Sequence, residues 1–286
     1  MKIYIPSHER AKTIKTHLQF KDSNVEYFIV VHNEEQKAKY LTNPTIEPKR
    51  LIVANVPLGV SKIREWIKFN LADEEWFIFM DDNIKYFTAV CEQEYNTLRM
   101  IDKFPEKFKK NDQAWRIPTY ENKIDNTRLM NIFDELKQEC INIDAGYAGF
   151  ATVQNSFFRG RKWSKVGYVI SKACLIKKDD IHYDENVTAM DDYCYTAENL
   201  LKYGKVLINK YVFPIAGHYE DGGIGKYEER LKYKIADCKY LIEKFNGLFV
   251  YYVKKNCHPE AELKIKFHSE KQVSKWKEQY VQSRNN

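Results

Sequence analysis

The chain has 286 residues, of which 30% are charged and 44% hydrophobic, and its formal net charge is +6. Such a length and composition suit a soluble globular protein that buries a substantial core. They exclude a membrane-spanning protein, because no apolar stretch approaches the roughly 20 residues that a spanning helix needs. The mild excess of positive charge suits an anionic substrate or nucleic acid, yet it decides nothing alone.

The six cysteines are widely scattered, and no CxxC pair or Cys/His metal spacing occurs among them. A disulfide framework or a structural zinc site is therefore not expected. We interpret the cysteines as reduced thiols of a cytoplasmic protein, most of them filling its core. The opening residues, Met-Lys-Ile-Tyr-Ile-Pro, predict a strand rather than a signal peptide.

Strand and helix patterns alternate through the first 85 residues. Strands are predicted at 2–5, 27–32, 50–56 and 74–80, and helices at 9–20, 33–42 and 59–71, the last with Ser61 as a candidate cap. The strands are apolar without a two-residue alternation, which is typical of a parallel sheet that helices cover on both faces. The sequence therefore predicts an α/β fold.

Polar side chains gather where three of these strands end. The three clusters are Pro6-Ser7-His8-Glu9-Arg10, His32-Asn33 and Asp81-Asp82-Asn83. Open α/β sheets bind their ligands outside the carboxyl ends of the strands. We therefore expect the three clusters to share one binding site.

The pattern weakens from about residue 100 to 140 and then resumes. The sequence predicts helices at 128–141, 190–204 and 227–245, strands at 145–153, 165–171 and 205–216, one or two β-like segments and a final helix. Gly204 is placed to end its helix. Residues 217–230 form the most glycine-rich loop in the chain.

Asp81, Asp82 and Asn83 have two interpretations. Asp and Asn are common where a strand turns into a loop, because their side chains bond to the nearby backbone. Oxygen ligands at the binding edge of a sheet also suit a hard cation such as Mg²⁺ or Mn²⁺. A cation there would neutralise a diphosphate and stabilise it as a leaving group.

Four segments, in this order, resemble those of GT-A glycosyltransferases, over roughly residues 2 to 220. They are the first-strand loop IYIPSHERAKTI, the run from NVPLGVSKIREW to FIFMDDN, the acidic helix start AMDDYCYTAENLLKYG, and AGHYEDGG with its late histidine. The third residue of the DxD-type motif is Asn83 rather than Asp, so Asp82 or the Asn83 amide must serve the metal. IPSHER, MDDN and GHYEDGG together look most like the phage-encoded TET-associated glycosyltransferases, which are implied to glycosylate hydroxymethylated pyrimidines in DNA.

The resemblance implies roles for residues that the sequence alone leaves ambiguous. Asp191 and Asp192 either complement the dipole of their helix or supply the catalytic base, as in inverting members of the group. His218 would complete a Mn²⁺ or Mg²⁺ site with Asp81, Asp82 and Asn83. The nucleotide-sugar donor, a UDP-sugar in this reading, is expected to contact Pro6, Ser7, Arg10, His32, Arg64, Asp81, Lys226 and Arg230.

A basic loop, SFFRGRKWSK at 156–165, interleaves cations with aromatic rings. It is either a solvated hairpin tip or a nucleic-acid contact, in which cations pair with phosphates and a ring stacks on a base. The residues in question are Arg159, Arg161, Lys162 and Trp163.

These features predict a GT-A domain over 1–220, with a nucleotide-sugar half at 1–90 and an acceptor half at 91–220, followed by a basic, mainly helical extension at 221–286. The expected reaction is metal-dependent transfer of a hexose or pentose to a hydroxyl, with a 5-hydroxymethylpyrimidine such as hydroxymethylcytosine in bacteriophage DNA as acceptor. A glycan or protein acceptor, a nucleotidyltransferase and a non-catalytic DNA-binding protein are the alternatives. A nucleotidyltransferase normally has a glycine-rich loop after its first strand, and PSHERAK has no glycine.

Overall fold

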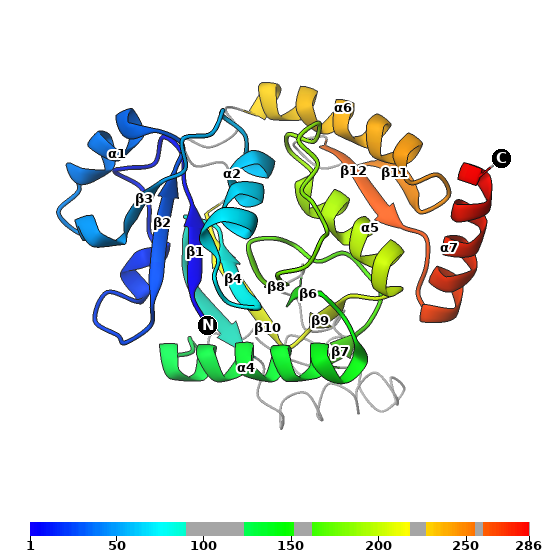
Figure 1. Ribbon diagram of the computed structural model, residues 1–286, viewed down its shortest axis with the longest axis horizontal. Helices are drawn as coiled ribbons and strands as arrows, with labels where there is room; N and C mark the ends of the chain where they lie inside the picture. Colours follow the sequence, from blue (N-terminus) through cyan, green and yellow to red (C-terminus); the bar gives the residue numbers. More distant parts are fainter. Residues whose placement is uncertain (90–122, 152–161, 218–226, 255–259, 286) are drawn as a thin grey trace, which may run out of the picture.

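A central sheet of eight strands organises the molecule (Figure 1). The fold is known from a computed structural model, which describes residues 1–89, 123–151, 162–217, 227–254 and 260–285. Across the sheet the order is β3 (Leu51–Val53), β2 (Tyr27–Val31), β1 (Ile3–Pro6), β4 (Trp76–Met80), β8 (Ala173–Lys177), β6 (Tyr147–Phe150), β9 (Leu207–Asn209) and β7 (Trp163–Ser164).

Most strand pairs are parallel. Strands β3, β2, β1 and β4 run the same way, as do β6 and β9, while β8 and the short β7 are antiparallel to their neighbours. This arrangement confirms the predicted α/β class with a mainly parallel, GT-A-like sheet.

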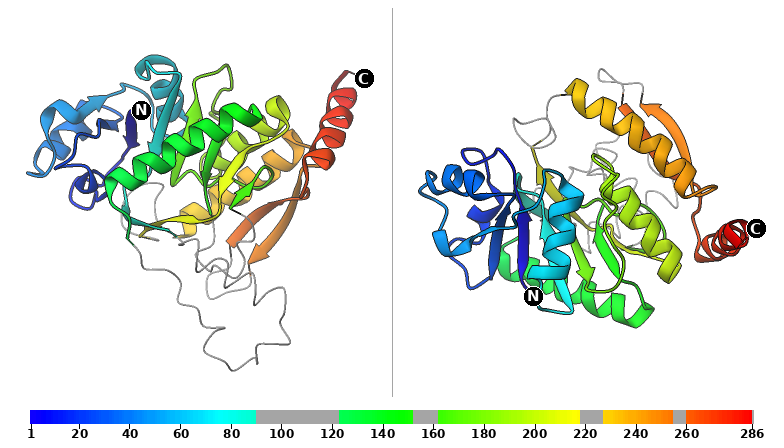
Figure 2. Two further views of the ribbon diagram at one scale, coloured as in Figure 1. Left: turned by 90° about the horizontal axis from the view of Figure 1, so that it is seen from below. Right: turned by 45° about the horizontal axis from the view of Figure 1, so that its top comes forward.

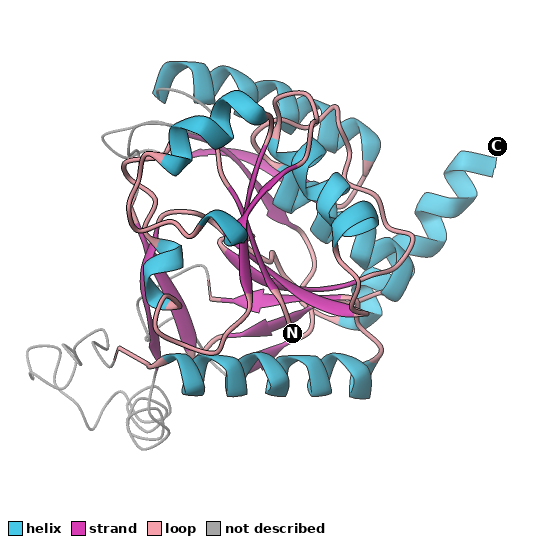
Figure 3. Ribbon diagram, turned by 60° about the vertical axis from the view of Figure 1, so that its left-hand side comes forward, coloured by secondary structure: helices cyan, strands magenta, loops and turns pink. Residues whose placement is uncertain are grey.

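Helices cover both faces of the sheet, as the apolar strands predicted (Figure 3). Side chains of β4 alternate between two cores: Ile78 faces one and Phe79 the other. The first core contains α1 (Glu34–Leu41) and α4 (Asn126–Ile143), and the second contains α2 (Val60–Trp66) and α5 (Asp191–Tyr203). Helix α2 continues as one π-helical segment, Ile67–Leu71.

Two smaller sheets lie beside the main one. Strand β5 (Ile84–Ala89), which the sequence reading missed, pairs with β10 (Val212–Ala216). Near the C-terminus β11 (Phe249–Lys254) pairs with β12 (Glu260–Ile265), flanked by α6 (Tyr227–Lys244) and α7 (Glu270–Asn285). Figure 2 shows α6 and this hairpin beside α5, with α7 at the outer end.

The C-terminal elements bury side chains in the same core as the central strands. Leu241 and Phe245 of α6 and the following turn, and Trp276 of α7, belong to the hydrophobic cluster that contains Tyr4 of β1 and Phe79 of β4. The predicted boundary at residue 220 therefore separates segments that share one core.

Two predicted elements do not form. Residues 9–20 form no helix beyond a 3₁₀ turn, Thr16–Gln19, because the backbone N–H groups of Lys15 and Thr16 donate to the Asp82 carbonyl instead. Leu18, in this 3₁₀ turn, is 48% exposed. Residues 165–171 form no strand; the strand is β8, directly after them.

The predicted strand 205–216 forms two strands, β9 and β10. They are separated by a turn in which the Tyr211 N–H donates to Asn209 Oδ1 at 2.9 Å.

The cap assigned to Ser61 is also wrong. Gly59 occupies the N-cap position, and the Ser61 hydroxyl donates to the Val187 carbonyl at 2.8 Å.

The described cysteines follow the sequence prediction. Cys140, Cys174, Cys194 and Cys238 are free and buried. Cys91 and Cys257 lie outside the described ranges. Within those ranges, no helix has the length and apolar character needed to cross a bilayer.

Candidate active site

A cavity of about 1580 Å³ opens at the carboxyl ends of β1, β2 and β4. Its walls include the three strand-end clusters, the start of α5 and the C-terminal elements. The sequence-predicted residues that line it are Pro6, Ser7, Arg10, His32, Arg64, Asp81, Asp82, Asn83, Asp191, Asp192 and Arg230. The three polar clusters therefore line one cavity, and their binding of a ligand stays a prediction.

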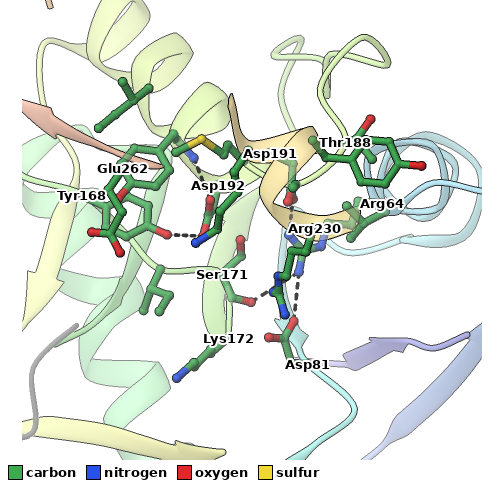
Figure 4. A pocket seen from close by; sticks show the side chains of 18 of the residues that line it. Arg64, Asp81, Tyr168, Ser171, Lys172, Thr188, Asp191, Asp192, Arg230 and Glu262 are labelled. Atoms are coloured by element: carbon green, nitrogen blue, oxygen red, sulfur yellow. Dashed lines mark hydrogen bonds and ion pairs between the residues drawn. The ribbon is translucent and has the colours of Figure 1, made fainter. Parts of the chain in front are cut away.

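Arg64 links two parts of the site that are distant in sequence (Figure 4). Its side chain, only 3% exposed, projects from α2 and pairs with Asp191 through Nη1 and with Asp81 through Nη2 at 3.2 Å. Burial acts to lower the pKa of Arg64, but the two carboxylates outweigh it and raise that pKa. Arg64 is therefore a permanent cation between the strand end and α5.

Two residues of the loop after β1 hold the Asp82 side chain in place. Its Oδ2 accepts from the Ser7 hydroxyl at 2.5 Å, and its Oδ1 accepts from Arg10 Nη1 at 2.8 Å. Burial raises the pKa of Asp82 to about 6, against the opposing effect of Arg10 and Ser7. Two arginines of the chain thus balance the charge of the adjacent strand-end carboxylates.

Asn83 joins the strand end to the segment before His218. Its Nδ2 donates to the Gly217 carbonyl at 2.8 Å, and the Gly217 N–H donates back to the Asn83 carbonyl at 3.3 Å. The Asn83 Oδ1 atom is buried without a hydrogen-bond partner. His218 and Lys226, predicted to contact metal and donor, lie outside the described residues.

These contacts bear on which atoms fit a divalent cation. Asp81 is 38% exposed, and Asn83 Oδ1 is an oxygen acceptor left over in a buried site. Both carboxylate oxygens of Asp82 already accept hydrogen bonds from side chains of the protein. Among the described residues, no three His, Cys, Asp or Glu side chains form a metal-binding group. Asp81 and Asn83 are thus the two described residues that fit best.

The start of α5 is fixed by a carboxylate from α6. Asp237 accepts from the backbone N–H groups of Thr188 (3.1 Å), Ala189 (2.6 Å) and Met190 (3.0 Å). The N-cap residue is Met190, whose own side chain makes no capping hydrogen bond. The buried Asp237 (3% exposed) caps the helix instead, although it lies 47 residues or more away from these N–H groups in the sequence.

Asp191 and Asp192 have different surroundings at that helix start. Asp191 pairs with Arg64, whereas Asp192 accepts from the Tyr168 hydroxyl through Oδ2 and from the Tyr193 N–H through Oδ1 at 3.0 Å. Burial raises the pKa of Asp192 to about 7, and the neighbouring Asp191 adds to that rise. A carboxylate with such a pKa can take up a proton near neutrality.

Comparison with known proteins agrees with this geometry. A family model described as TET-associated glycosyltransferase matches residues 1–208. The chain belongs to the TET-associated glycosyltransferase family. No curated protein matches it. The protein is thus a transferase that moves a sugar, and the family match ends at β9, before β10, α6 and all that follows.

Two cations that complete this glycosyltransferase's cavity are Arg230 and Lys172. Arg230 comes from α6, and its Nε is buried without a hydrogen-bond partner. Lys172, which the sequence reading missed, lies close enough that Arg230 adds to the lowering of its pKa by burial, while Asp81 opposes it. The Lys172 carbonyl accepts from the Asp81 N–H at 2.7 Å. Both cations line the part of the cavity next to Asp81.

His8 is a further cavity residue that sequence reasoning did not single out, although its cluster was noted. The His8 and His32 rings meet edge to face with centroids 5.4 Å apart. Burial lowers the pKa of both imidazoles, and each has a buried Nδ1 without a partner. Neutral rings of this kind suit a hydrogen bond to an uncharged group such as a nucleoside.

Two of the four residues predicted to contact nucleic acid are described by the structure, and they lie away from the cavity. Arg159 and Arg161 are outside the described residues. Lys162 and Trp163 stand at strand β7, the edge of the sheet, where Lys162 pairs with Glu135 of α4 and lies over the Trp163 ring, 4.9 Å from its centroid. Neither lines the cavity, and their contact with DNA stays a prediction.

Proposed function

We propose that this glycosyltransferase moves a sugar from a nucleotide sugar, with a UDP-sugar as first candidate, to the hydroxyl of a 5-hydroxymethylpyrimidine in DNA. The observation that carries the proposal is Asp192: a carboxylate with a pKa near neutrality that shares one cavity with the strand-end residues of β1, β2 and β4. A DNA acceptor would place the reaction in the cytoplasm, that of a host cell if the gene belongs to a phage.

Asp192 is the base in this scheme. It takes the proton of the acceptor hydroxyl, the oxygen bonds to the anomeric carbon, and the bond from that carbon to the diphosphate oxygen breaks. Asp191 is less suited, because Arg64 holds its carboxylate in an ion pair. Direct attack from the side opposite the leaving group would invert the anomeric centre.

The leaving diphosphate would face the cationic part of the cavity. Arg230 and Lys172 can pair with its oxygens, and phosphate pairing with such side chains is strong when partly buried. A bound Mn²⁺ or Mg²⁺ would add Lewis-acid neutralisation of the departing charge. We propose Asp81 and Asn83 as its ligands in the described residues, with His218 as the predicted third.

The function can be tested by incubating the protein with a panel of nucleotide sugars and Mn²⁺, with and without hydroxymethylated DNA, followed by mass spectrometry. The expected product is DNA heavier by one sugar per modified base. Transfer to a glycan or protein, with none to DNA, would retain the glycosyltransferase and remove the DNA acceptor.

Metal dependence has a separate test. Excess EDTA should stop transfer, and added Mn²⁺ should restore it. Asn83→Ala should weaken Mn²⁺ binding measured by calorimetry, whereas Asn33→Ala, at the end of β2 but outside the cavity lining, should not. Full activity in EDTA would remove the cation from the reaction.

A further inference from the structure

The C-terminal hairpin forms one wall of the active-site cavity, although it lies beyond the residues that the family model matches. Cross-strand pairing places Val250 opposite Lys264 and Tyr252 opposite Glu262. All four side chains line the cavity, whereas Tyr251, between Val250 and Tyr252 in sequence, does not. Alternate residues of a strand face opposite ways, so β11 contributes one face to the site, that of Val250 and Tyr252. Strand β12 contributes Glu262 and Lys264 and also Leu263 and Ile265, which belong to the core.

This face continues an aromatic surface that begins at the proposed base. Tyr168 donates to Asp192, and its ring stacks on that of Tyr193 with centroids 3.9 Å apart and planes 11° from parallel. The pKa of Tyr193 is raised first by burial, and then by Asp192, Glu262 and Tyr252. Asp192, Glu262 and Tyr252 are thus all near Tyr193, and Figure 4 shows Glu262 on the same side of the cavity as Tyr168.

Tyr252 is suited to stacking against a planar ligand. Its side chain is 38% exposed, while its hydroxyl is hydrogen-bonded to Glu262 Oε2 at 2.6 Å. A ring that is already held in place loses little further freedom when a ligand stacks on it. Stacking of one base on an aromatic side chain is worth about 1–3 kcal/mol.

The cavity also has room for a second ligand. Its volume of about 1580 Å³ exceeds the roughly 300–1,000 Å³ of pockets that hold one small molecule. A nucleotide sugar along the strand ends would occupy only part of it. Lys264, beside Val250 on the hairpin, supplies an exposed positive charge at the remaining end.

From these observations we infer that the β11–β12 hairpin is the acceptor subsite: the Tyr252 ring stacks on the pyrimidine that carries the reacting hydroxyl, and Lys264 pairs with a backbone phosphate next to it. The inference rests on the proposed transfer to DNA. A base in duplex DNA must leave the helix to reach Asp192, at a cost of a few kcal/mol, and stacking on Tyr252 offsets part of that cost.

The chain offers matched controls for both residues. Tyr251 is as exposed as Tyr252 and precedes it on the same strand, and Lys266 follows Lys264 by two residues; neither control lines the cavity. Tyr252→Ala should raise the KM for hydroxymethylated DNA about 5- to 150-fold, the equivalent of one lost stacking contact. Tyr252→Phe should keep most of the affinity, because the ring remains. Tyr251→Ala should leave this KM unchanged.

The role of Lys264 can be tested by measuring DNA affinity at different salt concentrations. Lys264→Ala should reduce the slope of log affinity for DNA against log salt by about 0.9, the value for one phosphate contact on duplex DNA, whereas Lys266→Ala should not. Hydrolysis of the nucleotide sugar without acceptor, and the melting temperature, should be the same in all five variants, which separates acceptor binding from damage to the fold or to the donor site.

The outcomes distinguish this inference from the function on which it rests. If the wild-type protein transfers sugar to DNA and Tyr252→Ala behaves as Tyr251→Ala does, the hairpin is not the acceptor subsite and the function stands. If the wild-type protein transfers no sugar to DNA, the proposed function and the inference both fall.

Discussion

At the scale of single residues, Asp192 gives the most direct prediction. Its folded-state pKa lies near 7, so the fraction that is ionised and able to act as base rises as the pH rises through that value. We expect kcat to increase along an acidic limb centred near pH 7. Asp192→Asn should lower kcat roughly 10²-fold or more with little change in donor affinity. Near wild-type turnover in that variant would show that the acidic helix start serves only the helix dipole.

Tyr168 influences the pH at which this acidic limb of the kcat profile is centred. Its hydroxyl donates to the ionised Asp192 and thereby lowers the pKa of that carboxyl, against the effect of burial. A hydrogen bond to a charged group contributes about 1.5–3 kcal/mol, and 1.36 kcal/mol corresponds to one pKa unit. Tyr168→Phe should therefore move the acidic limb of the kcat profile up by roughly one to two pH units. An unmoved limb would assign it to another group.

Loss of Arg64 should lower the stability of the fold. Its removal leaves Asp191, which is buried, without a cation, and unpaired buried charges of this kind cost about 3–5 kcal/mol. Arg64→Met should lower the free energy of unfolding by that amount in urea titrations at pH 8. Adding Asp191→Asn should recover part of the loss, because the unpaired charge is then gone. A double variant no more stable than the single one would contradict this account.

The sequence predicted which residues meet at the site better than it predicted their partners. Asp81 and Asp82 were placed correctly because each follows a buried strand. Their cations were not assigned, because Arg64 is paired with Asp191 across 127 residues and no local pattern encodes such a contact. Tyr168 was missed for a related reason: it stands on a segment that was expected to be a strand.

At the scale of elements, the position of α5 depends on α6. Asp237→Ala would leave three backbone N–H groups at the start of α5 without their acceptor. By comparison with lost helix caps, we expect a destabilisation of about 1–2 kcal/mol, together with a lower kcat, because Asp192 would lose its fixed place. Asp237→Asn, which keeps an acceptor oxygen, should lose less of both, and thermal melting with steady-state kinetics would check the order.

Helices with a clear apolar face, such as α4 and α5, were predictable, and so were apolar strands bounded by polar clusters. The segment 9–20 was not, because its apparent helical period was overridden by tertiary hydrogen bonds from Lys15 and Thr16 to the end of β4. The split between β9 and β10 depends on one turn at Asn209, which carries no glycine or proline to mark it.

At the scale of the whole molecule, the family-matched segment is not a self-sufficient unit of packing. Residues 1–208 contain the sheet, but Cys238, Leu241, Phe245 and Leu248 close the core on one of its faces and are each fully buried. Removing them would expose buried apolar side chains such as Met190 at the start of α5, whose Sδ lies 3.4 Å from the Cys238 Sγ. It would also remove Asp237, and with it the acceptor for the start of α5.

We therefore predict that a chain ending at residue 217 does not fold to a stable monomer. Burial of apolar surface contributes about 25 cal/mol per Å², so losing several large buried side chains exceeds the 5–15 kcal/mol by which domains are stable. The truncated chain should be insoluble on expression or lack a cooperative melting transition, whereas the full chain should show one. Removal of residues 281–286 alone, of which 281–284 are exposed at the end of α7, should leave that transition in place. A soluble, cooperatively melting 1–217 chain that still binds a nucleotide sugar would instead make the C-terminal elements an independent module, added to a complete glycosyltransferase domain.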